Sequence, residues 1–334
     1  GSISGLGSII VNGVRFETTD AVVYDSDDFS TDYDNSTSTF SSPLALGMTV
    51  ALFGDVDDAQ SLGRAARVRV VGGVRGTMSA IDTTALTLTL PTQIIQLSTT
   101  TTYGGTSDGT STGSAITNLT QLAALTNNPL LTVYGVSQAD GSFLATRVVV
   151  TNASTHAMDV AVRGTITAIS GSNYTVKTDA NNSITVNCNS CTIQPTGNTP
   201  VVGDAIRALA TDNTSWNGTT LTATRLQLVN AAYLTRFSGA PSTSTYAKIK
   251  GIATQANGNW YVGGVQVSGA TLTANTMYEI KGTWSGNVLA ASRVEVETQR
   301  SFTDSSGSNR AYSNEFYGAV SNLNGNAFTV QGVM

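Results

Sequence analysis

Few residues of this chain have the type and spacing that chemistry requires. Cys188 and Cys191 are separated by two residues and flanked by strand-like alternation. A disulfide that closes this small loop is the first interpretation. The alternatives need more: a redox Cys-x-x-Cys needs a βαβ setting with its first cysteine at a helix start, and zinc needs a second ligand pair. A structural disulfide indicates an oxidising compartment.

Two acidic runs near the start of the chain could bind a metal. Calcium takes about six to eight oxygen ligands, which two carboxylate clusters can supply together. The spacing does not match the helix–loop–helix calcium site, and the alternative is a pair of solvated loops. The candidate calcium ligands are Asp25, Asp27, Asp28, Asp55, Asp57 and Asp58.

Residues and motifs that could support catalysis are scarce in the sequence. The one histidine, His156, lies in a polar linker, so a hydrolytic triad lacks its base. Motifs for a nucleophile elbow, a phosphate loop or a zinc protease are absent from the sequence. A glycosidase needs only two carboxylates, but the acids here fall in predicted loops or on outward strand faces. We therefore expect that the protein is not an enzyme and, calcium apart, that it uses no cofactor.

The composition favours a β-structure. Charged residues are 12% of the chain, against roughly 25% in an average domain. Thr, Ser, Asn and Gly take their place, which favours strands and turns. A net charge of −5 disfavours nucleic acid, and no stretch is apolar enough to span a membrane. The chain begins inside a strand-like pattern, so we expect that a leader was removed or that the first two residues are foreign.

Several short patterns recur in the same order along the chain. One is a strand opening around glycine, a second is a strand that ends in glycine or a small residue, and a third is Ala-x-Arg followed by Val or Leu. The opening glycines are Gly76, Gly164, Gly251 and Gly318, with a weaker instance at Gly5. The arginines of the third pattern are Arg67, Arg147, Arg225 and Arg293. Such periodic recurrence indicates tandem repeats.

We expect an all-β chain of tandem small barrels of the oligonucleotide/oligosaccharide-binding (OB-like) kind, because closure removes sheet edges from short strands. Asn-Gly pairs, such as Asn257-Gly258, predict tight hairpin turns. An insertion at 98–128 is predicted to be a surface loop with a helical turn near 119–125. Units one and two abut at Val71-Gly72-Gly73, which predicts a stiff joint. The predicted units are 1–72, 73–159, 160–245 and 246–313, followed by a partial unit, 314–334.

The order of these patterns resembles that of a bacterial repeat family known as domain of unknown function 5666. The resemblance runs over nearly the whole chain through the glycine and Ala-x-Arg patterns, and it departs in the long insertions of units one and two. It implies exported or lipoprotein-like proteins with tandem small β-barrels. It implies no chemistry.

Two recurring sets of side chains have two interpretations each. The repeat arginines either form a ladder that reads a ligand or occupy equivalent surface or inter-unit positions, where their stems cover apolar surface. Trp216, Trp260, Tyr261 and Trp284 either form a sugar-stacking face or pack in cores and hairpins.

The partial unit leads to a hypothesis about assembly. It repeats only the opening hairpin of a unit, and an isolated hairpin is marginal in water. It is truncated, packs on unit four, or completes a β-structure in the next molecule by strand addition. The candidate assembly residues are Phe316, Gly318, Val320, Phe328, Val330 and Val333.

We expect a secreted or cell-surface subunit that self-assembles head-to-tail into a fibre or surface layer by strand complementation. The partner is then a second copy of the chain. The alternative is a monomeric cell-surface module that binds glycan or another ligand.

Overall fold

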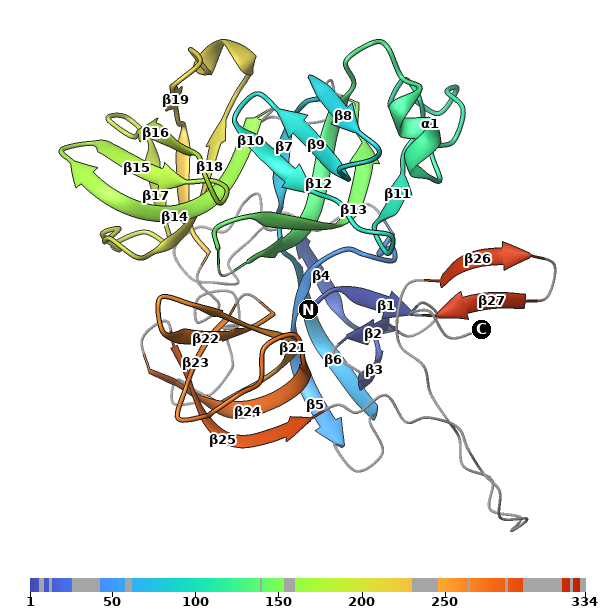
Figure 1. Ribbon diagram of the computed structural model, residues 1–334, viewed down its shortest axis with the longest axis vertical. Helices are drawn as coiled ribbons and strands as arrows, with labels where there is room; N and C mark the ends of the chain where they lie inside the picture. Colours follow the sequence, from blue (N-terminus) through green and yellow to red (C-terminus); the bar gives the residue numbers. More distant parts are fainter. Residues whose placement is uncertain are drawn as a thin grey trace.

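The computed structural model describes most of the chain as β-strands (Figure 1). The described residues are 1–5, 9–11, 14–25, 43–57, 62–138, 140–152, 160–229, 246–263, 265–285, 288–296, 320–324 and 327–330. Among them, the helices are α1 (Leu119–Ala123) and one 3-10 turn, Asn213–Ser215. The all-β prediction is confirmed, and α1 lies where a helical turn was predicted. In the described part of the chain, no helix is long and apolar enough to cross a membrane.

Unit 1 forms a six-stranded sheet in the order β1-β2-β3-β6-β4, with β5 also on β6. Its core is a cluster of buried aliphatic side chains that includes Ile3, Val50 and Val68. Its strands are β1 (Ile3–Gly5), β2 (Ile9–Val11), β3 (Val14–Glu17), β4 (Val22–Asp25), β5 (Val50–Asp57) and β6 (Leu62–Val70).

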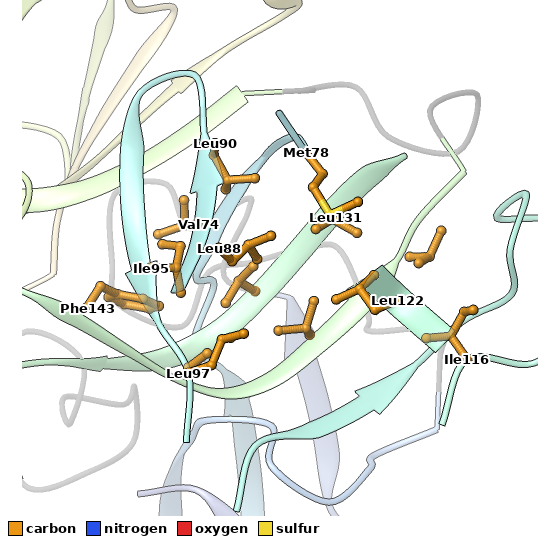
Figure 2. Close-up of a cluster of buried hydrophobic side chains, with 14 residues drawn as sticks. Val74, Met78, Leu88, Leu90, Ile95, Leu97, Ile116, Leu122, Leu131 and Phe143 are labelled. Atoms are coloured by element: carbon orange, nitrogen blue, oxygen red, sulfur yellow. The ribbon is translucent and has the colours of Figure 1, made fainter. Parts of the chain in front are cut away.

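Units 2 and 3 share one fourteen-stranded sheet, because β7 pairs with β14 through Arg75 and Ala161. Each unit keeps its own core, and Figure 2 shows that of unit 2, where Leu88, Ile95 and Leu131 meet. The strands of unit 2 are β7 (Val74–Thr77), β8 (Ala80–Asp82), β9 (Thr87–Leu90), β10 (Gln93–Gln96), β11 (Thr102–Gly104), β12 (Leu130–Ser137) and β13 (Phe143–Val150). Those of unit 3 are β14 (Val160–Ser170), β15 (Asn173–Lys177), β16 (Ser183–Asn187), β17 (Thr192–Gln194), β18 (Ala205–Ala210), β19 (Thr220–Thr222) and β20 (Arg225–Leu228).

Unit 4 is a closed barrel in the order β21-β22-β23-β25-β24. Asn257 and Gly258 join its first two strands, and both have the positive φ that a two-residue hairpin turn requires, as predicted. A separate hairpin, β26 (Val320–Asn324) with β27 (Ala327–Val330), forms a two-stranded sheet. The barrel strands are β21 (Tyr246–Ala256), β22 (Asn259–Val262), β23 (Val265–Ser268), β24 (Met277–Ser285) and β25 (Val288–Val296).

One pairing scheme recurs in all four units. The strand that ends the opening meander pairs in parallel with the last strand, as β3 with β6, β10 with β13, β16 with β19 and β23 with β25. The last strand then runs antiparallel to the strand before it. Closure of a barrel is found in unit 4, and the OB-like classification of the units stays a prediction.

The joint between units 1 and 2 is built on backbone carbonyls. The Thr102 hydroxyl donates to the Leu46 carbonyl at 2.9 Å, and Arg147 Nη1 donates to the same oxygen at 3.1 Å. Tyr134 of unit 2 is buried in the core cluster of unit 1. These contacts tie the two units together side by side.

Candidate functional site

The Ala-x-Arg pattern marks a β-bulge in the last strand. In unit 2, Tyr134 lies opposite Arg147 and Gly135 lies opposite Ala145, so Thr146 is the extra residue. The same shift follows Phe53 in unit 1 and Lys281 in unit 4. The repeated motif therefore specifies a fixed irregularity of the backbone, which re-aims the strand that follows it.

The glycine of the preceding strand is required by this bulge. A Cβ on Gly135 would lie 2.2 Å from the Leu144 carbonyl oxygen, and Gly54 and Gly282 meet the same obstruction. Unit 3 has Ala210 at this place. Its last strand is divided instead into β19 and β20, with Ala223 and Thr224 between them.

In units 1 to 3, a short extra strand covers the last strand beyond the bulge. We call β4, β11 and β17 the cover strands. Each pairs in parallel with the last strand, and each begins directly opposite the repeat arginine: Val22 opposite Arg67, Thr102 opposite Arg147 and Thr192 opposite Arg225. Three units therefore protect the same edge in the same register.

The second residue of each cover strand lies over the unit's core. Val23, Tyr103 and Ile193 pair with Val68, Val148 and Leu226 respectively. These three core partners are 0%, 1% and 0% exposed. Burial of the ring raises the pKa of Tyr103 to about 12. The cover strand thus removes both apolar surface and an open hydrogen-bonding edge from water.

Unit 4 lacks this protection in the part of the chain that the structure describes. On the side of β25 away from β24, no described strand pairs with Arg293–Val296, which we call the uncovered edge. Val294 and Val296 are 38% and 52% exposed, although Val294 lies opposite the fully buried Ile280. A row of backbone groups that no described strand pairs with therefore borders two exposed valines.

The length of one connection explains the difference. In units 1 to 3 the segments that hold the cover strands are residues 18–49, 97–129 and 188–204. The corresponding segment of unit 4 is only 269–276, and it places Leu272 in the barrel core without forming a strand. It turns back into β24 before it can extend along β25.

Charged side chains lie on the face of this sheet that points away from the barrel core, exposed on β25 and buried on β24. Arg293 forms an ion pair with Glu295 on β25. On β24, Glu279 contacts the ammonium groups of Lys248 at 3.2 Å and Lys281 at 3.6 Å. Position by position, β25 therefore alternates charged outward residues with valines, so a strand added there would meet apolar surface on one face only.

The repeat arginines do not gather into one ladder. Arg147 contacts unit 1, where burial lowers its pKa, while Arg293 is exposed and paired with Glu295. Arg67 and Arg225 are half-buried at the matching positions of units 1 and 3. Their shared feature is the register: all four lie opposite the residue that precedes the small residue of the neighbouring strand.

The cysteines lie in unit 3 at disulfide distance, with a Cα–Cα separation of 4.7 Å. Cys188 directly follows β16, and Cys191 directly precedes cover strand β17. The pair packs against the unit's core. It therefore staples the turn through which β17 reaches its place.

Most of the predicted calcium ligands have side chains outside the described part of the structure. Asp27, Asp28 and Asp58 lie outside the described residues, and only the backbones of Asp25 and Asp57 are described. Asp25 pairs with Val70 and Asp55 with Arg64, at opposite ends of β6, which separates them by about 20 Å. Among the described residues, no cluster of three metal-ligating side chains is found.

The predicted assembly residues lie in and around the β26–β27 hairpin. Val320, Phe328 and Val330 belong to its strands, whereas Phe316, Gly318 and Val333 lie outside the described residues. Within the described chain, β26 and β27 pair only with each other.

Sequence reasoning missed a cluster of buried arginines where units 2 and 3 meet. Arg163 Nη1 donates to the Gly72 carbonyl at 3.3 Å, and Arg207 Nε donates to the Gly73 carbonyl at 2.7 Å. Burial, and then the neighbouring Arg207 charge, lower the pKa of Arg163 to about 9. Arg75 donates to the Thr132 hydroxyl at 3.1 Å. The chain between units 1 and 2 is thus held by unit 3.

Comparison with protein families places the first two units. Residues 1–69 and 75–149 match the family described as "Domain of unknown function (DUF5666)". The two matches to the DUF5666 model cover the first two units. Both matched DUF5666 stretches extend as far as the repeat arginine and the last strand of their units. Units 3 and 4 share the pairing scheme of the two DUF5666 units. We find no match among curated proteins.

Proposed function

We propose that the protein is an extracellular structural subunit that assembles head-to-tail with copies of itself by strand complementation. The observation that carries this proposal is the uncovered edge, Arg293–Val296, on the last strand of unit 4. Natural sheets usually protect such edges, because a row of unpaired N–H and C=O groups recruits strands from other molecules.

The other three units support this interpretation. Each fills the same edge, in the same register, with a strand of its own chain. The scaffold therefore accepts a parallel strand at this place, and unit 4 differs only in supplying none among its described residues. Val294 and Val296 are the surface that such a strand would remove from water.

An acceptor in unit 4 and a donor elsewhere in the chain make the contact heterologous. After one heterologous contact, one copy still has a free donor and the other a free acceptor, so further copies add until the assembly closes into a ring, or it continues as a filament. The low charge of the chain suits an extended assembly, and the cysteine pair suits an oxidising exterior.

The competing function is a monomeric surface module that binds glycan. Such a module stacks sugar rings on exposed aromatic faces. Trp216 instead packs against the core of unit 3, and Trp260 and Trp284 pack against the core of unit 4, all partly buried. These contacts favour the structural role.

The test is self-association of the purified full chain, followed by analytical ultracentrifugation over a wide concentration range and by electron microscopy. We expect rings or filaments that Val294→Lys with Val296→Lys abolishes. Ile252→Lys is the matched control, because Ile252 is a similarly exposed (51%) aliphatic residue on β21 of the same barrel. A chain that stays monomeric at every concentration overturns the proposal.

A further inference from the structure

Among the described strands with an edge that no other described strand occupies, β27 is the one whose surroundings suit the uncovered edge of unit 4. β27 pairs along one side with β26, in a hairpin that pairs with no other described strand. A two-stranded hairpin is marginally stable by itself in water. The segment 318–334 that contains it carries no charged residue, so it lacks the charges that normally keep an edge from pairing.

We propose that β27 of a second copy is the strand that covers the uncovered edge of β25, in parallel, with Ala327 opposite Arg293. This inference rests on the proposed function and specifies its donor and register. Phe328 then lies opposite Val294, Thr329 opposite Glu295, and Val330 opposite Val296. The four residues of β27 fill the four positions of the uncovered edge.

The direction and register follow from the three cover strands. Each runs parallel to its last strand and starts opposite the repeat arginine. In each, an apolar residue, Val23, Tyr103 or Ile193, follows at the next position. Ala327 and Phe328 repeat this order, and Phe328 takes the position that the aromatic Tyr103 has in unit 2.

The alternation of apolar and polar residues along β25 and β27 selects one register. With Phe328 opposite Val294, Phe328 and Val330 of β27 meet the two exposed valines, and Thr329 lies beside the outward-facing Glu295. A shift by one residue exchanges the faces and puts Thr329 over the valines. The proposed register is the one that buries apolar groups against apolar groups.

The donor belongs to a second copy. In one molecule, the β26–β27 hairpin and β25 stand apart on different sides of the structure (Figure 1). Donor and acceptor therefore lie at different places on each copy, which is the arrangement that propagates a heterologous contact.

The test uses two full-length variants, each with one added cysteine, in which the native pair Cys188 and Cys191 is kept. One carries Glu295→Cys and the other Thr329→Cys. The two are mixed, allowed to assemble and mildly oxidised. We expect a heterodimer on non-reducing gels, because the register places these two residues opposite each other. Ser321→Cys on β26, mixed with the same Glu295→Cys partner, is the control that stays uncrosslinked.

The outcomes separate this inference from the function on which it rests. Assemblies in which Glu295→Cys crosslinks to Ser321→Cys and not to Thr329→Cys overturn the donor strand while the structural function stands. A single chain that carries both Glu295→Cys and Thr329→Cys provides a further check. If these two cysteines crosslink within one chain, at a yield independent of concentration, the chain covers its own edge and the proposal that a second copy supplies the strand is overturned. A chain with no self-association removes both proposals.

A second measurement protects the result against a misfolded variant. Phe328→Asp places a charge over Val294, and we expect at least a tenfold rise in the concentration required for assembly. Ser321→Asp puts the same charge on the neighbouring strand and leaves that concentration unchanged. Equal effects of the two substitutions overturn the assigned strand.

Discussion

The last strands of units 2 and 4 contain the same signals and have different surroundings. Both have the bulge at Ala-x-Arg, and both have a glycine in the strand before it. Beyond the bulge, Val148 of unit 2 is buried beneath β11, whereas Val294 of unit 4 is exposed. The difference therefore originates outside the strand, in the length of the connection between β10 and β12 in unit 2 and between β23 and β24 in unit 4. A repeat can keep its framework while the length of one loop decides whether its edge is covered.

The largest expected effect comes from the same substitution at the two matched positions. Val148→Asp buries a carboxylate in a closed core, so we expect a loss of about 3 kcal/mol or more in the unfolding free energy of unit 2. Val294→Asp places it at an open edge, and we expect a loss below about 1 kcal/mol for the monomer. Urea unfolding followed by hydrogen exchange in each unit measures both. Equal losses would contradict the comparison.

The second prediction removes a cover strand's central contact. Tyr103→Ala leaves Val148 exposed as Val294 is, and the half-buried ring predicts a loss of about 2 kcal/mol. Amide exchange in 147–149 should accelerate, because β11 is held to β13 at these residues. Ser111→Ala, an exposed change in the same insertion, is the control. Unchanged exchange would mean that β11 does not protect the edge.

The third prediction concerns the staple of β17. Replacement of both Cys188 and Cys191 by serine opens a very small loop, so the expected loss is about 2 kcal/mol at most. We expect the effect to be local, with faster exchange at Arg225–Gln227 beneath β17 and none in β13. Mass spectrometry of exchanged peptides resolves the two strands. A uniform effect over all units would argue against a local staple.

The smallest effect is a titration. The pKa of Tyr103 is raised from 10.0 to about 12, so its contribution to stability is complete below pH 10 and is lost as the pH rises towards 12. The difference between the ultraviolet titrations of the native chain and Tyr103→Phe isolates this group. A midpoint near 10 would show that the ring is not covered by the unit.

The sequence allowed the fold class and the periodic framework to be predicted. Glycine recurs in the preceding strand because a Cβ on Gly135 would collide with a carbonyl oxygen. Ala-x-Arg recurs because the bulge needs one extra residue. Both constraints are local, so each produces a pattern that can be recognised in the sequence. The turn at Asn257-Gly258 was predictable for the same reason, since both residues adopt positive φ.

No such sequence pattern predicted the cover strands. Thr102-Tyr103-Gly104 lies within a Thr/Ser/Gly-rich insertion and becomes a strand only by pairing with β13, about 45 residues away. The absence of a described cover strand in unit 4 was equally difficult to predict, because its only sign in the sequence is a short connection. Comparison of the segment 269–276 with its three counterparts is the one indication that the sequence contains.

The buried arginines were hidden for a different reason. Arg163 and Arg207 alternate with apolar residues and look like outward, solvated positions, where arginine usually lies. Only the apposition of units 2 and 3 buries them, and that apposition is set by β7 meeting β14. No pattern within one unit reveals such a contact.

The hydrogen bonds from Arg163 and Arg207 to the Gly72 and Gly73 carbonyls have a mechanical consequence. Tension applied along the chain at unit 1 reaches these two peptide groups before it reaches β7. There it is divided, because part of the load passes through the guanidinium groups into unit 3. When the molecule is pulled, units 2 and 3 should therefore unfold in one event, so that the molecule resists stretching in blocks larger than a single unit.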